Sequence, residues 1–328
     1  MQVTDEKIKL YAVRDFGQRL SVVMDFLRQN WKPLLLFLTY FLLPLSLVQA
    51  LSLNGFMGNY MDLIGGMTQG AQDPSVSNIV SMLLKLLAFI GLYIIGAILM
   101  YSVVYGLMRI YERGEGKLTA ITWQQLKPDF FFSMKRTLIL MLASLALTVV
   151  VMVVLSLLAA LAVMITPALI FLVYLFLIVV AVFLAPPLSL ITPVYVFEDN
   201  QTLMGAIRKG LRLGFGTWLS TVGVMFVLYF IINIVSQFVA MPWAIMFFIK
   251  AFLGMGIDGI DGSWTENIFF TFGYYLAAVL QCYCGYLASS SLIVGCAYLY
   301  GHAAEKLDNI TVESNIRNFE NLYLITDN

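Results

Sequence analysis

The sequence predicts an all-α membrane protein in which six transmembrane helices form three hairpins, each preceded by an amphipathic interfacial helix. Two observations lead to this prediction. The 328 residues are 61% hydrophobic and 12% charged, with a mean hydropathy of +0.88, which is more apolar surface than a soluble domain of this length can bury. Basic residues also recur in alternate gaps between the apolar stretches. We therefore expect membrane lipids and no nucleic acid as partners.

Several apolar stretches are long enough to cross a membrane as helices. A hydrocarbon core about 30 Å thick requires roughly 20 helical residues, because each residue adds about 1.5 Å. Residues 137–197 contain no charged residue, and this run is long enough for two crossings with a turn at Thr166–Pro167. The alternating strands of a membrane barrel are missing, which leaves a helical bundle. The expected spans are residues 32–53, 79–107, 137–165, 167–192, 218–240 and 268–300.

The distribution of Lys and Arg predicts the orientation of these spans. Of the 19 basic residues, all but Lys85 and Lys250 lie in segments 1–32, 108–136 and 198–217 or in the tail. Because short cytoplasmic loops retain basic residues, both termini are expected on the cytoplasmic side. The connections on the other side carry acidic residues instead, namely Asp62, Asp73, Asp258, Asp261 and Glu266.

The chain also shows signs of a threefold internal repeat. A basic segment with helical periodicity and one Trp precedes the first, third and fifth spans, which is typical of an interfacial helix. Two hairpin exits place Tyr and Glu seven residues apart, from Tyr105 to Glu112 and from Tyr298 to Glu305, and the third ends on Glu198. We expect one integral membrane domain, residues 1–328, with repeat units at about 11–112, 119–198 and 202–305 and a short cytoplasmic tail at 306–328.

A family resemblance rests on residues 198–218, which read Glu-Asp-Asn-Gln-Thr-Leu-Met-Gly-Ala-Ile-Arg-Lys-Gly-Leu-Arg-Leu-Gly-Phe-Gly-Thr-Trp. An acidic exit, a basic helix and Gly-x-Trp before a span resemble the membrane domain of the glycerophosphoryl diester phosphodiesterase family, and Gln29-Asn30-Trp31 resembles the same element. The resemblance implies a six-helix domain with interfacial helices in a bacterial inner membrane. The soluble catalytic barrel of the full phosphodiesterase has no counterpart in the sequence, so no catalytic residue is implied.

Three groups of residues are candidates for binding or for packing. Cations of the third basic segment could bind lipid phosphates or could serve only to retain the segment in the cytoplasm. Two glycines four residues apart could allow close helix packing or relax the bend into the fifth span. Prolines at the end of the fourth span could free carbonyl groups for a polar site or could only kink the helix. The lipid- or partner-facing candidates are Arg208, Lys209, Arg212, Trp31, Trp123 and Trp218, the glycines are Gly210 and Gly214, and the prolines are Pro186, Pro187 and Pro193.

The remaining chemistry-bearing residues indicate packing more than reactivity. Cys282, Cys284 and Cys296 all fall in the sixth span, where we expect packing thiols and neither a metal nor a cofactor. His302, the single His, is expected to be an interfacial polar residue. Segment 241–256 is too short to cross and too apolar for water, so it is expected as a separate surface helix or re-entrant piece.

Three classes of function remain. The favoured class is a non-enzymatic scaffold or accessory subunit that binds lipids, including anionic ones, or a protein partner in the membrane. The alternative is a transporter or channel, although transporters usually place ionisable groups at mid-membrane and the expected span centres hold none. Asn233 and Gln237 are among the few polar candidates there. An intramembrane enzyme is the third class, for which only Ser and Thr side chains are available at that depth.

Overall fold

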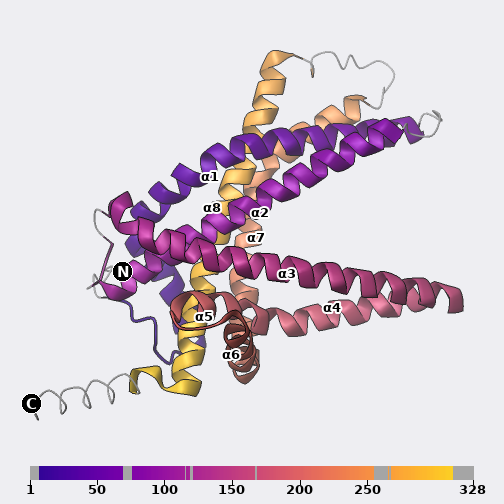
Figure 1. Cartoon of the computed structure of the whole chain (residues 1–328). Helices are drawn as coiled ribbons and strands as arrows, with labels where there is room; N and C mark the ends of the chain where they lie inside the picture. Colours follow the sequence, from indigo (N-terminus) through magenta and orange to yellow (C-terminus); the bar gives the residue numbers. More distant parts are fainter. Residues whose placement is uncertain are drawn as a thin grey trace, which may run out of the picture. The chain divides into compact units, whose positions relative to one another are not determined.

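The computed structural model contains helices and no strand over the residues it describes, which are 7–68, 76–114, 116–118, 121–166, 168–254, 265 and 267–312. Six of the helical stretches are long and apolar enough to cross a membrane, which confirms the prediction of an all-α, multi-pass membrane protein. The helices are α1 (Phe16–Thr68), α2 (Val76–Arg113), α3 (Trp123–Ile165), α4 (Ala168–Ser189), α5 (Ile191–Phe197), α6 (Leu203–Gly216), α7 (Trp218–Gly254) and α8 (Ile268–Asp308) (Figure 1).

Helix α1 joins the first basic segment to the first expected span. The two parts meet at a kink, where Asn30 leaves the helical region with φ −118° and ψ 20°. Pro33 contributes to this kink because it lacks the N–H that would bond to the carbonyl of Gln29. The Asn30 side chain offsets part of the loss, since its Nδ2 donates to the Phe26 carbonyl at 3.1 Å and its Oδ1 accepts from the Leu118 N–H at 2.9 Å.

Helix α7 is longer than the sequence suggested. The expectation of a separate piece at 241–256 is wrong as far as Gly254, because one helix runs from Trp218 to Gly254 with Pro242 inside it. Pro242 removes a single backbone hydrogen bond, and the residues on both sides of it are apolar and helical, so the helix continues through it. Residues 255 and 256 lie outside the described part of the chain.

Prolines mark the change from α4 to α5. Pro186 and Pro187 lie in the last turn of α4, and Leu190 separates this helix from α5. Pro193 lies in the first turn of α5, where backbone N–H groups have no partner within the helix and proline is tolerated. Helix α6 then begins after Thr202, whose side chain caps it by accepting from the Gly205 N–H at 3.1 Å.

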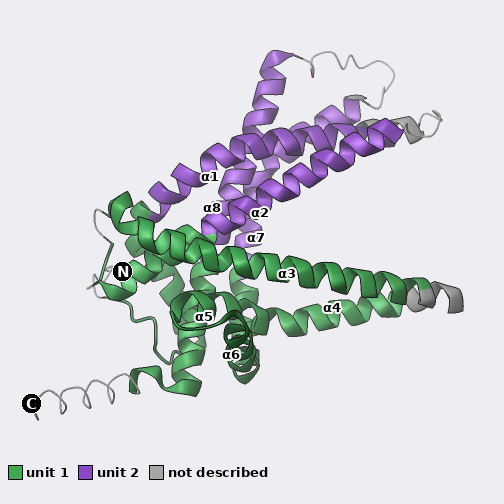
Figure 2. Cartoon of the chain, in the orientation of Figure 1, with its two compact units in different colours: residues 1–33, 101–228, 292–328 green, residues 34–100, 229–291 purple. Residues whose placement is uncertain are grey.

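The chain divides into two compact units (Figure 2). Unit 1 comprises residues 1–33, 101–228 and 292–328, and unit 2 comprises residues 34–100 and 229–291. In unit 1, the buried Phe26 ring lies edge-on to Tyr111 and Tyr298, with ring centroids 5.1 and 5.8 Å away.

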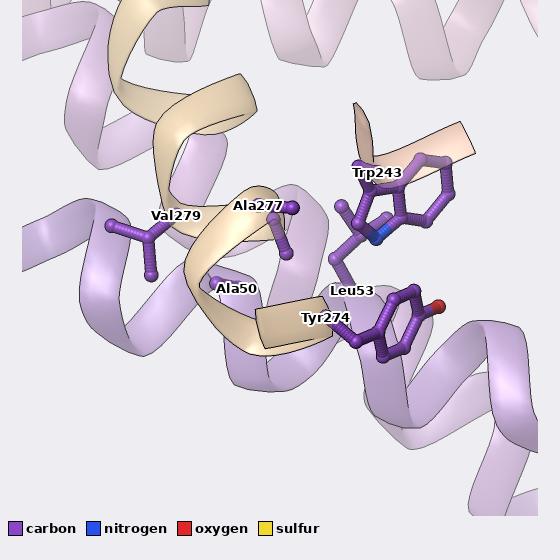
Figure 3. Close-up of a cluster of buried hydrophobic side chains, with 7 residues drawn as sticks. Ala50, Leu53, Trp243, Tyr274, Ala277 and Val279 are labelled. Carbon is purple, nitrogen blue, oxygen red and sulfur yellow. The ribbon is translucent and has the colours of Figure 1, made fainter. Parts of the chain in front are cut away.

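The core of unit 2 combines small and aromatic side chains from α1, α7 and α8 (Figure 3). Alanines occupy the crossing of α1 and α8, where their size permits a close approach of the two helices. On the same cluster, the Trp243 ring stacks on Phe247 and Tyr274, with centroid separations of 5.3 and 6.1 Å. The buried members of this core are Ala50, Leu53, Trp243, Tyr274, Ala277, Ala278 and Val279.

Candidate functional site

Unit 1 contains a network of poorly exposed charges, and Arg109 of α2 is at its centre. The Arg109 Nε lies 3.0 Å from Asp129 Oδ1 of α3, and its Nη2 lies 2.8 Å from Asp199 Oδ1. The Arg109 and Asp129 side chains are only 12% and 9% exposed, and Arg113 pairs with the same Asp129 oxygen. Because both side chains have so little contact with water, replacing either one breaks a poorly exposed ion pair and leaves the other charge with one remaining partner, Asp199 for Arg109 or Arg113 for Asp129.

Arg136 of α3 caps the carboxyl-terminal end of α5. Its guanidinium donates to the carbonyl of Glu198 at 2.6 Å and also to the carbonyls of Tyr195 and Asp199. A cation at this position neutralises the negative end of the helix and supplies donors to carbonyls that lack a helical partner. The Phe132 ring contacts both guanidinium groups, with the Arg109 and Arg136 carbons 4.3 and 4.4 Å from its centroid.

The Glu198 carboxylate collects donors from α6, α8 and the connection before α6. Its Oε1 accepts from the Tyr300 hydroxyl at 2.7 Å and lies 2.7 Å from the Lys209 Nζ, while its Oε2 accepts from Gln201 at 2.9 Å. The Glu198 and Lys209 side chains are 18% and 21% exposed. The hairpin-exit glutamate of the sequence is therefore a poorly exposed contact point for three neighbouring elements.

The three candidate lipid-binding cations of α6 differ in their surroundings. Lys209 also lies 3.5 Å from Asp308, and Arg212 makes a two-pronged contact with the same carboxylate at 2.6 and 2.8 Å. Arg208 is exposed, and among the residues that the structure describes no carboxylate pairs with it. Two of the three cations therefore have a partner within the chain, and one is open to an external anion.

Residues 7–15 pack along the ends of α2 and α8. The Ile8 N–H donates to the Tyr111 hydroxyl at 2.8 Å, and the Arg14 N–H donates to His302 Nδ1 at 3.0 Å. Burial lowers the pKa of the Arg14 guanidinium and raises the pKa of the Tyr11 hydroxyl to about 12, so Tyr11 stays protonated beside Tyr300. His302 is thus a hydrogen-bond acceptor for the N-terminal segment.

The candidate glycines lie against the α4–α5 region. A Cβ atom added to Gly210 would be 2.8 Å from the Ile191 Cα, and one added to Gly214 would be 2.3 Å from the Pro187 Cα. Both distances are shorter than real contacts, so the backbones meet at these two glycines. Pro186 and Pro193 are buried nearby in the chain. The structure therefore places Gly214 against the candidate Pro187 and Gly210 against Ile191.

The candidate tryptophans fall into two environments. Trp218 donates from Nε1 to the Phe183 carbonyl at 2.8 Å, which ties the start of α7 to α4. Trp31 and Trp123 are 55% and 38% exposed, and the Lys32 ammonium lies 5.8 Å from the Trp31 ring centroid. Trp123 also lies edge-on to the Phe130 ring, with centroids 5.3 Å apart, so Trp31 is the most exposed of the three and Trp218 has an internal role.

Polar groups inside unit 2 are not the ones the sequence suggested. Gln49 of α1 is buried, and its Oε1 accepts from the Tyr286 hydroxyl of α8 at 2.9 Å. The Gln281 Oε1 is buried and has no hydrogen-bond partner in the described part of the chain. Asn233, by contrast, donates to the Tyr229 carbonyl of its own helix, and Gln237 is exposed. Helical phase, rather than depth in the span, decides which polar residue faces inward.

The charged side chains of this network pair with one another. Over the described residues, no group of three or more His, Cys, Asp or Glu side chains is placed to hold a metal ion. Four carboxylates of unit 1 are engaged by cations or hydroxyl groups of the same unit, namely Asp129, Glu198, Asp199 and Asp308. In comparisons with protein-family models, curated proteins and solved structures, nothing matches this chain.

Proposed function

We propose that this chain is a non-enzymatic scaffold or accessory subunit of a bacterial inner membrane, with both termini in the cytoplasm and a basic surface that binds anionic lipid headgroups. In this proposal the six helices form three hairpins and the basic segments lie at the cytoplasmic interface. The resemblance of residues 198–218 to the phosphodiesterase membrane domain remains a prediction that points to the same membrane.

The proposal rests on a difference between two sets of cations in unit 1. The poorly exposed cations are neutralised by carboxylates or backbone carbonyls of the same unit. A second set is exposed, and over the described ranges no carboxylate pairs with any of them. This second set consists of Lys9, Arg28, Lys32, Lys127, Lys135, Arg208 and Lys306.

Unpaired surface cations are the ones that attract a charged membrane. Each contributes about 1 kcal/mol of attraction to an anionic leaflet, whereas a cation already paired with a carboxylate has little charge left to offer. Trp31 and Trp123 lie on the same basic segments and are exposed, as expected of aromatic anchors at an interface. The basic surface can equally receive an acidic protein partner at the membrane.

The test compares unpaired with paired cations. We expect a variant with Lys127→Gln, Lys135→Gln and Arg208→Gln to retain less phosphatidylglycerol during purification, by about fivefold per charge, with an unchanged melting temperature. A matched variant with Lys209→Gln and Arg212→Gln should lose thermal stability instead, because it removes the cation paired with Glu198 and both cations paired with Asp308. Lipid analysis by mass spectrometry measures the first effect. Unchanged lipid retention in the triple variant would refute lipid binding by this surface.

Transport is the second candidate, and it rests on the polar groups inside unit 2. The buried Gln281 Oε1 has no partner in the described part of the chain, so it can accept a hydrogen bond from a passing solute or water. The test is solute flux into liposomes that contain the purified protein. A flux abolished by Gln281→Leu but kept by Gln237→Leu, whose side chain is exposed, would favour transport over the scaffold role.

A further inference from the structure

A pocket opens on unit 2 where α1, the end of α7 and the start of α8 meet. Its volume is about 420 Å³, which is enough for a lipid headgroup, and it opens to the surroundings. Over the described residues, the lining combines apolar and aromatic side chains with one cation, one amide and hydroxyl groups, and no acidic residue is among them. The lining residues are Leu51, Asn54, Lys250, Ile268, Thr271, Phe272, Tyr274 and Tyr275.

Lys250 is the charged group of this pocket. Its ammonium lies 5.8 Å from the centroid of the Tyr274 ring, and over the described ranges no carboxylate pairs with it. Lys85 provides a contrast within the same unit, because its Nζ donates to Asn59 Oδ1 at 2.9 Å. A cation on an apolar surface gains most from an anion supplied from outside the protein.

Asn54 supplies a second donor to the pocket. The Asn54 Oδ1 accepts from the Trp243 Nε1 at 2.9 Å, which leaves the NH₂ group of this amide as a donor at the pocket. Ile268 and Thr271 belong to the first turn of α8, where the positive end of the helix favours negative charge. The cation, the amide donor and the positive end of the helix thus all favour the binding of an anion.

The walls select an amphiphile rather than a free ion. Leu51, Ile268 and Phe272 are 60%, 75% and 63% exposed, and they form an apolar border around the donors. We infer that this pocket binds an anionic phospholipid. The Lys250 ammonium and the Asn54 NH₂ contact its phosphate, and the apolar border contacts its acyl chains. This inference concerns unit 2 and does not depend on the basic surface of unit 1.

Trp243 provides a local reporter for this site. Its ring stacks on Tyr274, a residue of the pocket wall, with centroids 6.1 Å apart (Figure 3). The experiment uses the full chain with its other four tryptophans changed to Phe, reconstituted in bilayers that contain a small fraction of phospholipid with brominated acyl chains. Bromine quenches tryptophan at short range, so quenching measures occupancy beside Trp243. The four replaced residues are Trp31, Trp123, Trp218 and Trp264.

We expect brominated phosphatidylglycerol to associate with this site about fivefold more strongly than brominated phosphatidylcholine, the difference for one cation at the membrane surface. Lys250→Gln should reduce this preference to about one, and Lys250→Arg should keep it. Lys85→Gln is the matched control, because it removes the other lysine of unit 2 and should leave the preference unchanged. Arg208→Gln should also leave it unchanged, which separates this result from the basic surface of unit 1.

Three outcomes would overturn the inference. The first is equal quenching by the two lipids in the protein with native Lys250. The second is a preference that survives Lys250→Gln or that Lys85→Gln also removes. The third is loss of the preference when inorganic phosphate is added at the concentration of the anionic lipid, with ionic strength held constant, because the site would then take free phosphate rather than a lipid. Size-exclusion chromatography of each variant verifies that it is folded.

Discussion

Replacing Gly214 with alanine should destabilise unit 1, because α6 meets the end of α4 at this residue. The added Cβ would lie 2.3 Å from the Pro187 Cα and 3.0 Å from the Pro187 N, whereas ordinary contacts begin at 3.4 Å. The atoms in the way belong to the backbone, so no side-chain rotation relieves the overlap. Helix α6 must therefore move away from α4 by about 1 Å, which is the difference between the 2.3 Å contact and an ordinary contact of 3.4 Å.

The size of the effect follows from two opposing contributions. Overpacking of a well-packed contact costs about 1–3 kcal/mol, and here the shift also pulls the fully buried Ala206 and Leu213 of α6 away from their neighbours. Alanine is a better helix former than glycine by about 1 kcal/mol, which offsets part of this cost. The free energy of unfolding should fall by about 1–2 kcal/mol for Gly214→Ala, and Gly210→Ala should act in the same direction beside Ile191.

Thermal unfolding of the purified protein in detergent measures this effect. Gly285→Ala is the matched control, since a Cβ atom at Gly285 would have no atom within 4 Å and the residue lies inside α8. The control should keep or raise the melting temperature, while Gly214→Ala should lower it. If the two variants have the same melting temperature, α6 does not pack on α4 as closely as described, and the reasoning is refuted.

Three further substitutions test contacts within unit 1. Asp129→Asn should lower the free energy of unfolding by about 2 kcal/mol, because the poorly exposed Arg109 loses the less exposed of its two carboxylates and keeps only Asp199; chemical denaturation measures this. Tyr300→Phe should cost about 1–2 kcal/mol in the same assay, since it removes a 2.7 Å hydrogen bond to the charged Glu198. Gly301→Ala should speed amide hydrogen exchange in residues 7–15, because its Cβ would lie 2.2 Å from the Leu10 carbonyl oxygen.

Each of these substitutions has a control at an exposed or open position. Asp25 is exposed and Tyr229 is 59% exposed, so Asp25→Asn and Tyr229→Phe should change stability by less than about 0.5 kcal/mol. A Cβ atom at Gly17 would have no atom within 4 Å, so Gly17→Ala should leave hydrogen exchange of residues 7–15 unchanged. If a control changed the free energy of unfolding, or the rate of hydrogen exchange, as much as its partner variant did, the contact tested by that variant would be contradicted.

Hydropathy alone predicted the number of apolar helices, because each crossing needs a continuous apolar run that few other structures require. Helix ends were harder to predict. The kink at Asn30 joins a basic segment to a span within one helix, and Pro242 fails to end α7, since a membrane helix tolerates one missing backbone hydrogen bond. Averaged hydropathy does not indicate where a helix kinks or ends.

The charge network could not be predicted from the sequence, because its partners are far apart along the chain. Arg109 pairs with Asp129, twenty residues away, and with Asp199, ninety residues away, and both contacts depend on where helices cross. Asp129 is the only acidic residue between Lys117 and Arg136, which was a signal for an ion pair, although the sequence did not indicate its partner. Similarly, helical phase turns Gln49 toward Tyr286, whereas the polar residues chosen by depth, Asn233 and Gln237, do not turn inward.

The neighbours Arg208 and Lys209 show why counting basic residues overstates the charge available to a membrane. The positive-inside rule treats them alike, since it depends on cytoplasmic retention during insertion. After folding, Lys209 lies 2.7 Å from Glu198 with 21% of its side chain exposed, so its field beyond the surface is largely cancelled, while Arg208 remains exposed. In the proposed topology, all cations of this basic segment count toward retention in the cytoplasm, whereas some of them stabilise the fold and only those left unpaired can bind anionic lipid.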